Sequence, residues 1–273
     1  MNKLLKRTHY WLQQWPNMEK EGKYIYCIIG TKQERNFGPI GIGQRGDEVL
    51  TIGYDDLSMV VSSYPLTRIP TNRENMISHQ KVIEEVMNEF DSVLPVRFGT
   101  IASSADEIRN LLDRRYREFK GALTDIDHKI ELGVKGIWKN MDAIFDEIVE
   151  DDKEIRSLKE RIASDTNGHN AQMKIEVGKM VEQALQKKKK QEAERAVDAL
   201  RRTAFDHKLN KTIGDEMFMN AAFLVDKGRE KEFDNIMDDL SDEYKDRIKF
   251  MYAGPLPVFN FVNIVIYPEE WEK

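Results

Sequence analysis

The chain has 273 residues, enough for one large domain or two of ordinary size. Apolar residues make up 40% of it and charged residues 33%, so it can build a core and is not a disordered chain. Its formal net charge of −6 gives no overall attraction for nucleic acid or an anionic lipid membrane.

Residues 1–21 are predicted to be an N-terminal extension. Their basic residues accompany no apolar run of the length a signal peptide needs. No apolar run elsewhere approaches the ~20 residues of a membrane-spanning helix, so we expect a soluble, cytoplasmic protein. Tyr10, Trp11 and Trp15 are expected to dock on the chain itself or on a partner.

Three strands are predicted next, in KYIYCIIG, EVLTIGY and LSMVVSSYP. The first contains Cys27, the single cysteine, so no disulfide can form within the chain, which fits a reducing cytosol. A thiol in an apolar strand is usually a small buried hydrophobic group, and a nucleophilic cysteine is the less favoured alternative.

The loop between the first two strands contains GIGQRG, whose glycines have the G-x-G-x-x-G spacing of dinucleotide-binding loops. In those loops the pyrophosphate binds at the N-terminus of the helix that follows. Here the following residues, DEVLTIGY, predict a strand. We therefore predict no nucleotide-binding site at this loop.

A helix is predicted in TNRENMISHQKVIEEVMNEF, with Thr71 and Glu74 as a capping box. His79 lies near the apolar stripe of this helix, which leaves two interpretations. It is either a helix histidine hydrogen-bonded to a neighbouring loop, which we favour, or a catalytic residue.

The segment VLPVRFGT, residues 93–100, reads as a short strand that carries an arginine. Alternation puts Leu94, Val96 and Phe98 on one face and Val93, Pro95 and Arg97 on the other. Pro95 cannot donate to a ladder, so it predicts an edge strand or a bulge.

Gly99 permits a turn into a second helix, for which Ser104 and Glu107 form a capping box. We expect Arg97 to anchor a loop or an acidic neighbour such as Asp55 or Asp56 through a forked hydrogen bond. Partner binding by Arg97 is less favoured, and catalysis least.

The second half of the chain repeats the mixture of strands and helices. IELGVKGIW alternates as a half-buried strand, and MFMNAAFLV predicts another. Residues of about 151–211 are polar and helical. The chain closes with a helix in FDNIMDDLSDEY and a segment broken by a Gly254-Pro255 corner.

This order predicts an α+β protein with two α+β domains, at residues 22–125 and 126–273. The second domain is predicted to be ferredoxin-like, with a helical hairpin inserted at about 151–211.

No catalytic or metal-binding constellation is visible. The histidines, His9, His79, His128, His169 and His207, share no metal-ligand spacing. The basic run Lys187–Lys190 is followed by glutamates, so Lys188–Glu192 and Lys190–Glu194 pairs predict a solvated helix face and not a nucleic-acid site.

Taken in order, several motifs resemble the gas vesicle protein F/L family. They are YIYCIIG, DDLSMVVSSYP, SHQKVIEEV, VLPVRFGT with SADEIRNLL, IELGVKGIW, NAAFLVDKGREKEFDNIM and AGPLPVFNFV. The resemblance covers most of residues 23–267 and is weakest in the middle helices. Gln80, Val258 and Asn260 depart from the family pattern, which leaves the F and L branches open.

The resemblance implies a non-catalytic gas vesicle accessory protein, either a minor vesicle component or an assembly or nucleation factor. Its implied partners are the major shell protein (A/B type) and other accessory proteins, and the resemblance implies no cofactor. The family motif residues, structural or partner-binding, are His79, Leu94, Pro95, Arg97, Phe98, Gly99, Glu131, Gly254 and Pro255. The alternative is a small-molecule enzyme with a cleft around Arg97 and His79.

Overall fold

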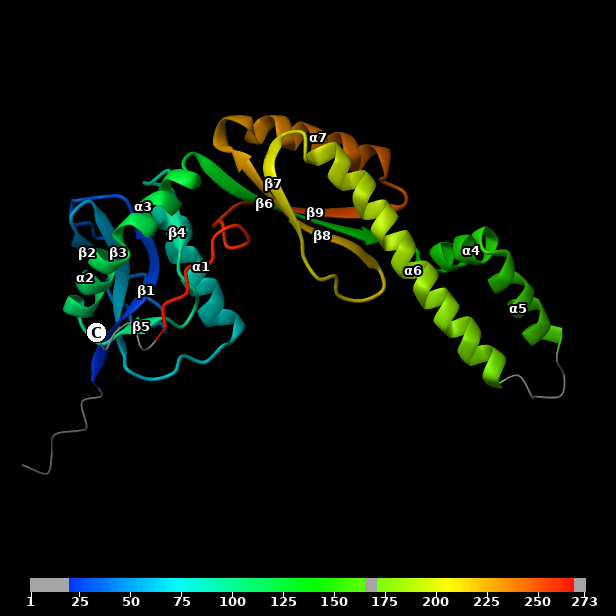
Figure 1. The fold of residues 1–273 in the computed structure, drawn as a ribbon, viewed down its shortest axis with the longest axis horizontal. Helices are drawn as coiled ribbons and strands as arrows, with labels where there is room; N and C mark the ends of the chain where they lie inside the picture. Colours follow the sequence, from blue (N-terminus) through cyan, green and yellow to red (C-terminus); the bar gives the residue numbers. More distant parts are fainter. Residues whose placement is uncertain (1–19, 165–170, 268–273) are drawn as a thin grey trace, which may run out of the picture. The chain divides into compact units, whose positions relative to one another are not determined.

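The computed structural model describes residues 20–164 and 171–267, and the expected docking of Tyr10, Trp11 and Trp15 falls outside them (Figure 1). The chain divides into two compact units. Unit 1 runs up to Asp127 and resumes at Val262, and unit 2 is His128–Phe261. Residues 262–267, assigned from the sequence to the second domain, therefore belong to the first unit.

Unit 1 contains an antiparallel sheet whose strands follow the order β2-β3-β1-β4, with β5 also paired to β1. The strands are β1 (Glu21–Ile29), β2 (Leu50–Tyr54), β3 (Leu57–Pro65), β4 (Val93–Pro95) and β5 (Ile101–Ala102). The short strand β4 lies at one edge and β2 at the other.

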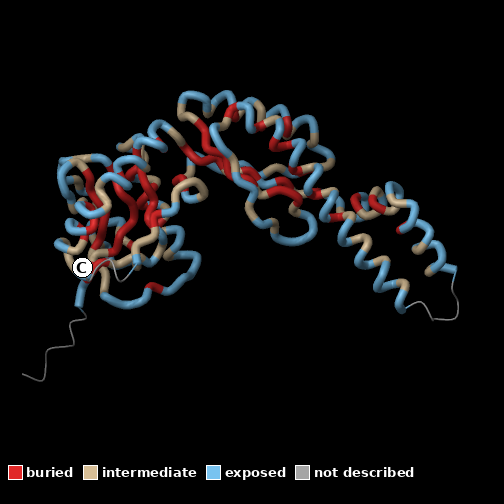
Figure 2. Tube along the Cα trace, in the orientation of Figure 1, coloured by how far each residue is buried: buried red, intermediate tan, exposed pale blue. Residues whose placement is uncertain are grey.

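Three helices, α1 (Arg73–Met87), α2 (Ala105–Arg114) and α3 (Tyr116–Asp125), accompany this sheet. Strand β1 is fully buried from Tyr24 to Ile29, which requires cover on both faces (Figure 2). Val82, Ile83 and Val86 of α1 share one core cluster with β1. The buried apolar residues of α2 and α3 lie outside that cluster, and we assign them to the other face.

The helix caps test two sequence predictions. The side chain of Asn72, not Thr71, caps α1 by accepting from the Asn75 N–H at 2.8 Å, so the first capping box was wrong. The Ser104 hydroxyl accepts from the Glu107 N–H at 3.2 Å, which confirms the second N-cap. The Glu107 carboxylate reaches back to the Ser103 N–H at 2.8 Å.

Unit 2 contains a second antiparallel sheet, in the order β7-β8-β6-β9. Its elements are β6 (Lys129–Trp138), α4 (Met141–Asp151), α5 (Lys153–Ser164), α6 (Ala171–Leu200), β7 (Ala204–Leu209), β8 (Met217–Asp226), η1 (Lys227–Arg229), α7 (Glu230–Glu243) and β9 (Ile248–Leu256). The chain order of strand, helices, two strands, helix and strand is the one found in ferredoxin-like units. The helical insertion ends at Leu200, because Ala204–Leu209 forms strand β7 where the sequence predicted helix.

The core of unit 2 lies between the sheet and helices α4, α6 and α7, which contribute Ile144, Leu200 and Phe233 among others. Helix α5 contributes one buried residue, Ile155, and α6 none before Leu185 (Figure 2). The far end of the α5–α6 helix pair therefore adds little to the core.

The basic run Lys187–Lys190 has four different environments. Lys187 is exposed, and Lys190 pairs with Glu194 at 3.9 Å as predicted. Lys188 pairs with Glu147 at 2.9 Å instead of Glu192. Lys189 is buried, and its ammonium donates to the Gly214 carbonyl at 2.8 Å. The run is therefore not only a solvated helix face, because Lys189 is buried and makes a contact within the fold.

Candidate functional site

His79 and the VLPVRFGT segment meet in the core of unit 1. The Tyr24 hydroxyl lies 2.8 Å from His79 Nδ1, and His79 Nε2 lies 3.2 Å from the Val96 carbonyl oxygen. A carbonyl only accepts hydrogen bonds, so Nε2 carries the proton and Nδ1 accepts from Tyr24. The Tyr24 oxygen in turn accepts from the Gly99 N–H at 3.2 Å. This chain of hydrogen bonds joins β1 and α1 to the motif.

Burial sets the charge of these groups. His79 is 3% exposed, and desolvation lowers its pKa to about 4, with the hydrogen bond to Val96 acting in the opposite direction. Desolvation likewise raises the pKa of Tyr24, and that of Tyr26, whose ring stacks on His79, to about 12. His79 is therefore neutral at neutral pH, and its hydrogen bond to the Val96 carbonyl is a contact with a neighbouring segment of the kind favoured from the sequence.

Arg97 lies in a different environment from His79. Its side chain is exposed, and across residues 20–164 and 171–267 its guanidinium has no hydrogen-bond or ion-pair partner. The expected contact with Asp55 or Asp56 was wrong. Asp55 pairs with Lys32 at 3.4 Å, and Asp56 accepts from both Tyr116 and Lys120 at 2.6 Å.

The rest of the motif builds an edge strand. Pro95 lies in β4 opposite Cys27, which agrees with the expectation of an edge position. On its other side the segment is not bare, because Val96 forms a parallel bridge with Ile264. Leu94 is fully buried.

The predicted alternation fails after Val96. Phe98 packs against the core cluster that contains Val93, although the sequence pattern put it on the opposite face. The reason is that β4 ends at Pro95 and the chain turns at Gly99, whose φ of +87° lies in the region that glycine adopts without strain. Cys27 is fully buried, and desolvation raises its pKa, so it fits the inert interpretation.

In unit 2, Glu131 fixes the segment that follows β9. The carboxylate is 4% exposed and accepts from the Asn260 backbone N–H at 2.9 Å and from its side-chain amide at 2.6 Å. Desolvation raises the pKa of Glu131, and the bonds from Asn260 oppose the shift. Gly254 and Pro255 lie in β9, where the register to β6 shifts, and a Cβ at Gly254 would come within 2.4 Å of the Leu132 side chain.

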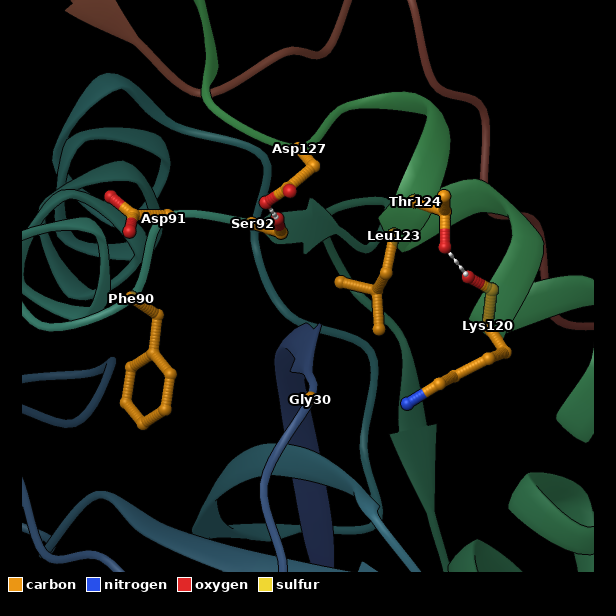
Figure 3. A pocket seen from close by; sticks show the side chains of 8 residues that line it. All are labelled: Gly30, Phe90, Asp91, Ser92, Lys120, Leu123, Thr124 and Asp127. Carbon is orange, nitrogen blue, oxygen red and sulfur yellow. Dashed lines mark hydrogen bonds between the residues drawn. The ribbon is translucent and has the colours of Figure 1, made fainter.

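A cavity of about 280 Å³ opens in unit 1 near the end of β1 (Figure 3). Its polar side chains are engaged with protein groups. The Ser92 hydroxyl donates to Asp127 at 2.7 Å, the Thr124 hydroxyl to the Lys120 carbonyl at 3.0 Å, and the Lys120 ammonium to Asp56. The cavity therefore shows no set of groups poised for chemistry.

Within residues 20–164 and 171–267, no group of three or more His, Cys, Asp or Glu side chains is arranged to hold a metal ion. No helix in those ranges has the length and apolar character needed to span a bilayer.

The sequence alone points to His79 but not to its hydrogen-bond partner Tyr24. The usable signal was the Tyr24-x-Tyr26 alternation in the first strand.

Comparison with known proteins gives a consistent result. The family model for gas vesicle synthesis protein GvpL/GvpF matches residues 22–263. Gas vesicle protein F1 of Halobacterium salinarum is 26% identical over 252 residues, which cover 92% of this chain and 97% of that protein. Gas vesicle protein F of a Streptomyces species is 28% identical over 223 residues, covering 82% and 91% respectively.

Two solved structures share the fold. GvpF from Anabaena sp. superposes with a TM-score of 0.76 at 20% identity, covering 90% of this chain and 100% of that one. GvpF from Microcystis aeruginosa gives 0.74 at 22% identity, covering 89% and 99%. This protein, whose fold they share, combines two antiparallel sheets with helices.

Proposed function

Because the chain belongs to the gas vesicle protein GvpL/GvpF family, whose model spans residues 22–263, we propose that it is a non-catalytic accessory protein of gas vesicle formation. It is a minor vesicle component or an assembly or nucleation factor in the cytoplasm. It binds the major shell protein (A/B type) and other accessory proteins, and it uses no cofactor. The family match over most of the chain carries this proposal.

The enzyme alternative has less support. It requires Arg97 and His79 to converge on one cleft, whereas Arg97 is exposed and His79 is 3% exposed with both ring nitrogens hydrogen-bonded. A catalytic group must reach the atom with which it exchanges a proton.

The outer edge of β7 is the surface we assign to the shell protein. Three large apolar side chains are unusually exposed there and in the loop that follows, Phe205 at 64%, Leu209 at 55% and Ile213 at 75%. Within the described chain, residues 205–209 have no backbone partner on their outer side. An open strand edge pairs with another extended segment, and the exposed side chains of Phe205, Leu209 and Ile213 favour an apolar one.

The other edges favour this assignment by contrast. The outer side of β2 is covered by residues 35–37, through Phe37 N–H to Val49 and Thr51 N–H to Arg35. The outer side of β4 is bridged by Ile264. Strand β9 contains Pro255, which removes one donor from that edge.

A pull-down of the major shell protein on the purified chain tests the proposal. We expect retention by the unchanged chain and loss in a Phe205→Ser, Leu209→Ser double variant. Ile175→Ser is the matched control, because Ile175 is 56% exposed on α6 and lies away from the edge. Retention by no form of the chain would remove the shell protein as a direct partner, and full retention by the double variant would remove only the β7 edge.

A deletion variant tests the helix pair. Replacing residues 158–177 with a short Gly-Ser linker removes its far end and leaves Ile155, Leu185 and the sheet intact. We expect this variant to keep the shell protein and to lose other accessory proteins. Loss of the shell protein instead would move its binding surface to the helices.

A further inference from the structure

A cleft in unit 2 lies where α4, α6, α7 and the start of β9 meet. Its volume is about 290 Å³. The apolar part of its lining consists of Ala196, Leu240, Ile248 and Phe250. The remaining lining residues are charged or hydroxylated, so the cleft combines an apolar region with a polar rim.

Both carboxylates of the rim are satisfied by the protein itself. The guanidinium of Arg247 donates to Glu147 at 2.8 Å and to Glu192 at 2.7 Å. The Trp138 indole donates to Glu192 at 2.6 Å, and Lys188 pairs with Glu147 at 2.9 Å. The hydrogen bond from Arg247 lowers the pKa of Glu147 to about 2, so the Glu147 carboxylate stays ionised.

Arg195 differs from the other two cations of the rim, Lys188 and Arg247, which both pair with the carboxylates. Three cations and two carboxylates line the cleft, and Arg195 has no hydrogen-bond or ion-pair partner among the residues that the structure describes. Arg195 is exposed on α6, and Tyr244, which lies within electrostatic reach of it, also lines the cleft. An uncompensated guanidinium above an apolar floor is complementary to a carboxylate attached to an apolar group.

We propose that this cleft binds an organic carboxylate that carries one bulky apolar group. Arg195 receives the carboxylate, and the surface of Ala196, Leu240 and Phe250 receives the apolar group. The volume is at the small end of the ~300–1,000 Å³ of ligand pockets, which matches a ligand of side-chain size. The source is either a free acid or a partner segment in which an acidic residue adjoins a bulky apolar one. This inference does not depend on shell-protein binding.

Titration of the full chain, followed by amide NMR shifts, tests the site. The probes are 3-phenylpropionate, its neutral analogue 3-phenylpropanamide, and the capped peptide acetyl-Ala-Glu-Phe-Ala-amide. We expect saturable shifts around residues 192–196 and 240–250, with the acid binding about tenfold more tightly than the amide because a hydrogen-bonded charge pair is lost. Tighter binding of the peptide than of the acid identifies a partner segment as the source, and the reverse identifies a free acid.

Variants separate the site from general charge effects. Arg195→Gln is expected to weaken binding about tenfold. The matched control, Lys190→Gln, makes the same charge change on the same helix outside the cleft and is expected to leave binding unchanged. Ala196→Leu fills the apolar floor and is expected to abolish saturation. Equal binding of acid and amide, equal loss in both charge variants, or shifts mapping elsewhere would overturn the proposal.

Discussion

At the scale of single residues, Tyr24 and His79 have an organising role that neither could have alone. The Tyr24 hydroxyl accepts from Gly99 and donates to His79, and His79 donates to Val96. Each of these polar groups lies in an apolar environment and is hydrogen-bonded to a residue in another segment of the chain. The position of the VLPVRFGT motif against α1 is therefore specified by hydrogen bonds as well as by packing.

Removing one hydroxyl tests this role. Tyr24→Phe keeps the ring but leaves His79 Nδ1 without its donor in a buried position. We expect the free energy of unfolding to fall by about 2 kcal/mol in urea titrations. Tyr54→Phe is the control, since Tyr54 is 38% exposed, and it should change stability by less than about 0.5 kcal/mol. Equal effects of the two variants would contradict the buried network.

The depressed pKa of His79 makes a second prediction, on pH dependence. In the unfolded chain the imidazole titrates near 6.5, and in the folded chain near 4, so between these values the unfolded state binds the extra proton. Stability is fully present above pH 6.5 and is lost as pH falls toward 4. The loss attributable to His79 between pH 7 and pH 5 is on the order of 2 kcal/mol.

Comparing the unchanged chain with His79→Gln isolates this effect. The difference in unfolding free energy between the two proteins should shrink as pH falls from 7 to 5. Carboxylates such as Glu131, whose raised pKa acts in the opposite direction, contribute equally to both proteins and cancel. A difference independent of pH would show that His79 is not buried as a neutral group.

At the scale of elements, Lys189 joins helix α6 to the β7–β8 hairpin. Lys189→Met removes the hydrogen bond to the Gly214 carbonyl, so we expect amides of residues 210–216 to exchange about tenfold faster. Global stability should change by less than about 1 kcal/mol, because the desolvation cost of the buried ammonium also disappears. Lys187→Met, on the exposed side of the same run, should alter neither; faster exchange in both variants would contradict the assignment.

Elements with a regular apolar pattern could be predicted from the sequence, and the others could not. Strand β6 alternates cleanly, and its sequence predicts a strand. Strand β7 contains Phe205-Asp206-His207-Lys208, and its sequence predicts helix instead. That strand exists because β8 pairs with it, which is a tertiary cause absent from its own residues.

The same distinction holds for the candidate site. The burial of His79 follows from its place beside an apolar stripe, but its partners come from segments that only the fold brings together. Arg97 was expected to find an acidic partner because arginines often do, yet Asp55 and Asp56 are held by Lys32, Tyr116 and Lys120. Spacing along the chain carries no information on such competition.

At the scale of the molecule, unit 2 is a continuous segment inserted into unit 1. Residues 128–261 have their own sheet and core cluster, so we expect this fragment to unfold cooperatively by itself, as measured by circular dichroism in urea. A non-cooperative, broad transition would contradict the division into units.

Unit 1 is not a continuous segment of the chain. Residues after 261 pair with its β4 edge and provide a hydrogen-bond acceptor for Arg115. Val96 bridges Ile264, and the Arg115 guanidinium donates to the Val265 carbonyl at 2.9 Å. A fragment ending at residue 127 should therefore be less stable than one in which a Gly-Ser linker joins 127 to 262. Equal stability of the two fragments would show that the returning segment adds nothing.

The bridge between Val96 and Ile264 also bears on how the protein is made. A ribosome that has finished β4 must add about 170 more residues before the covering segment emerges, which takes on the order of 10–30 s at roughly 5–20 residues per second. During that interval the nascent chain carries a bare strand edge, while unit 2 is still being synthesised. Translation speed through residues 128–261 therefore sets how long each new molecule is open to strand pairing with its neighbours on the same messenger RNA.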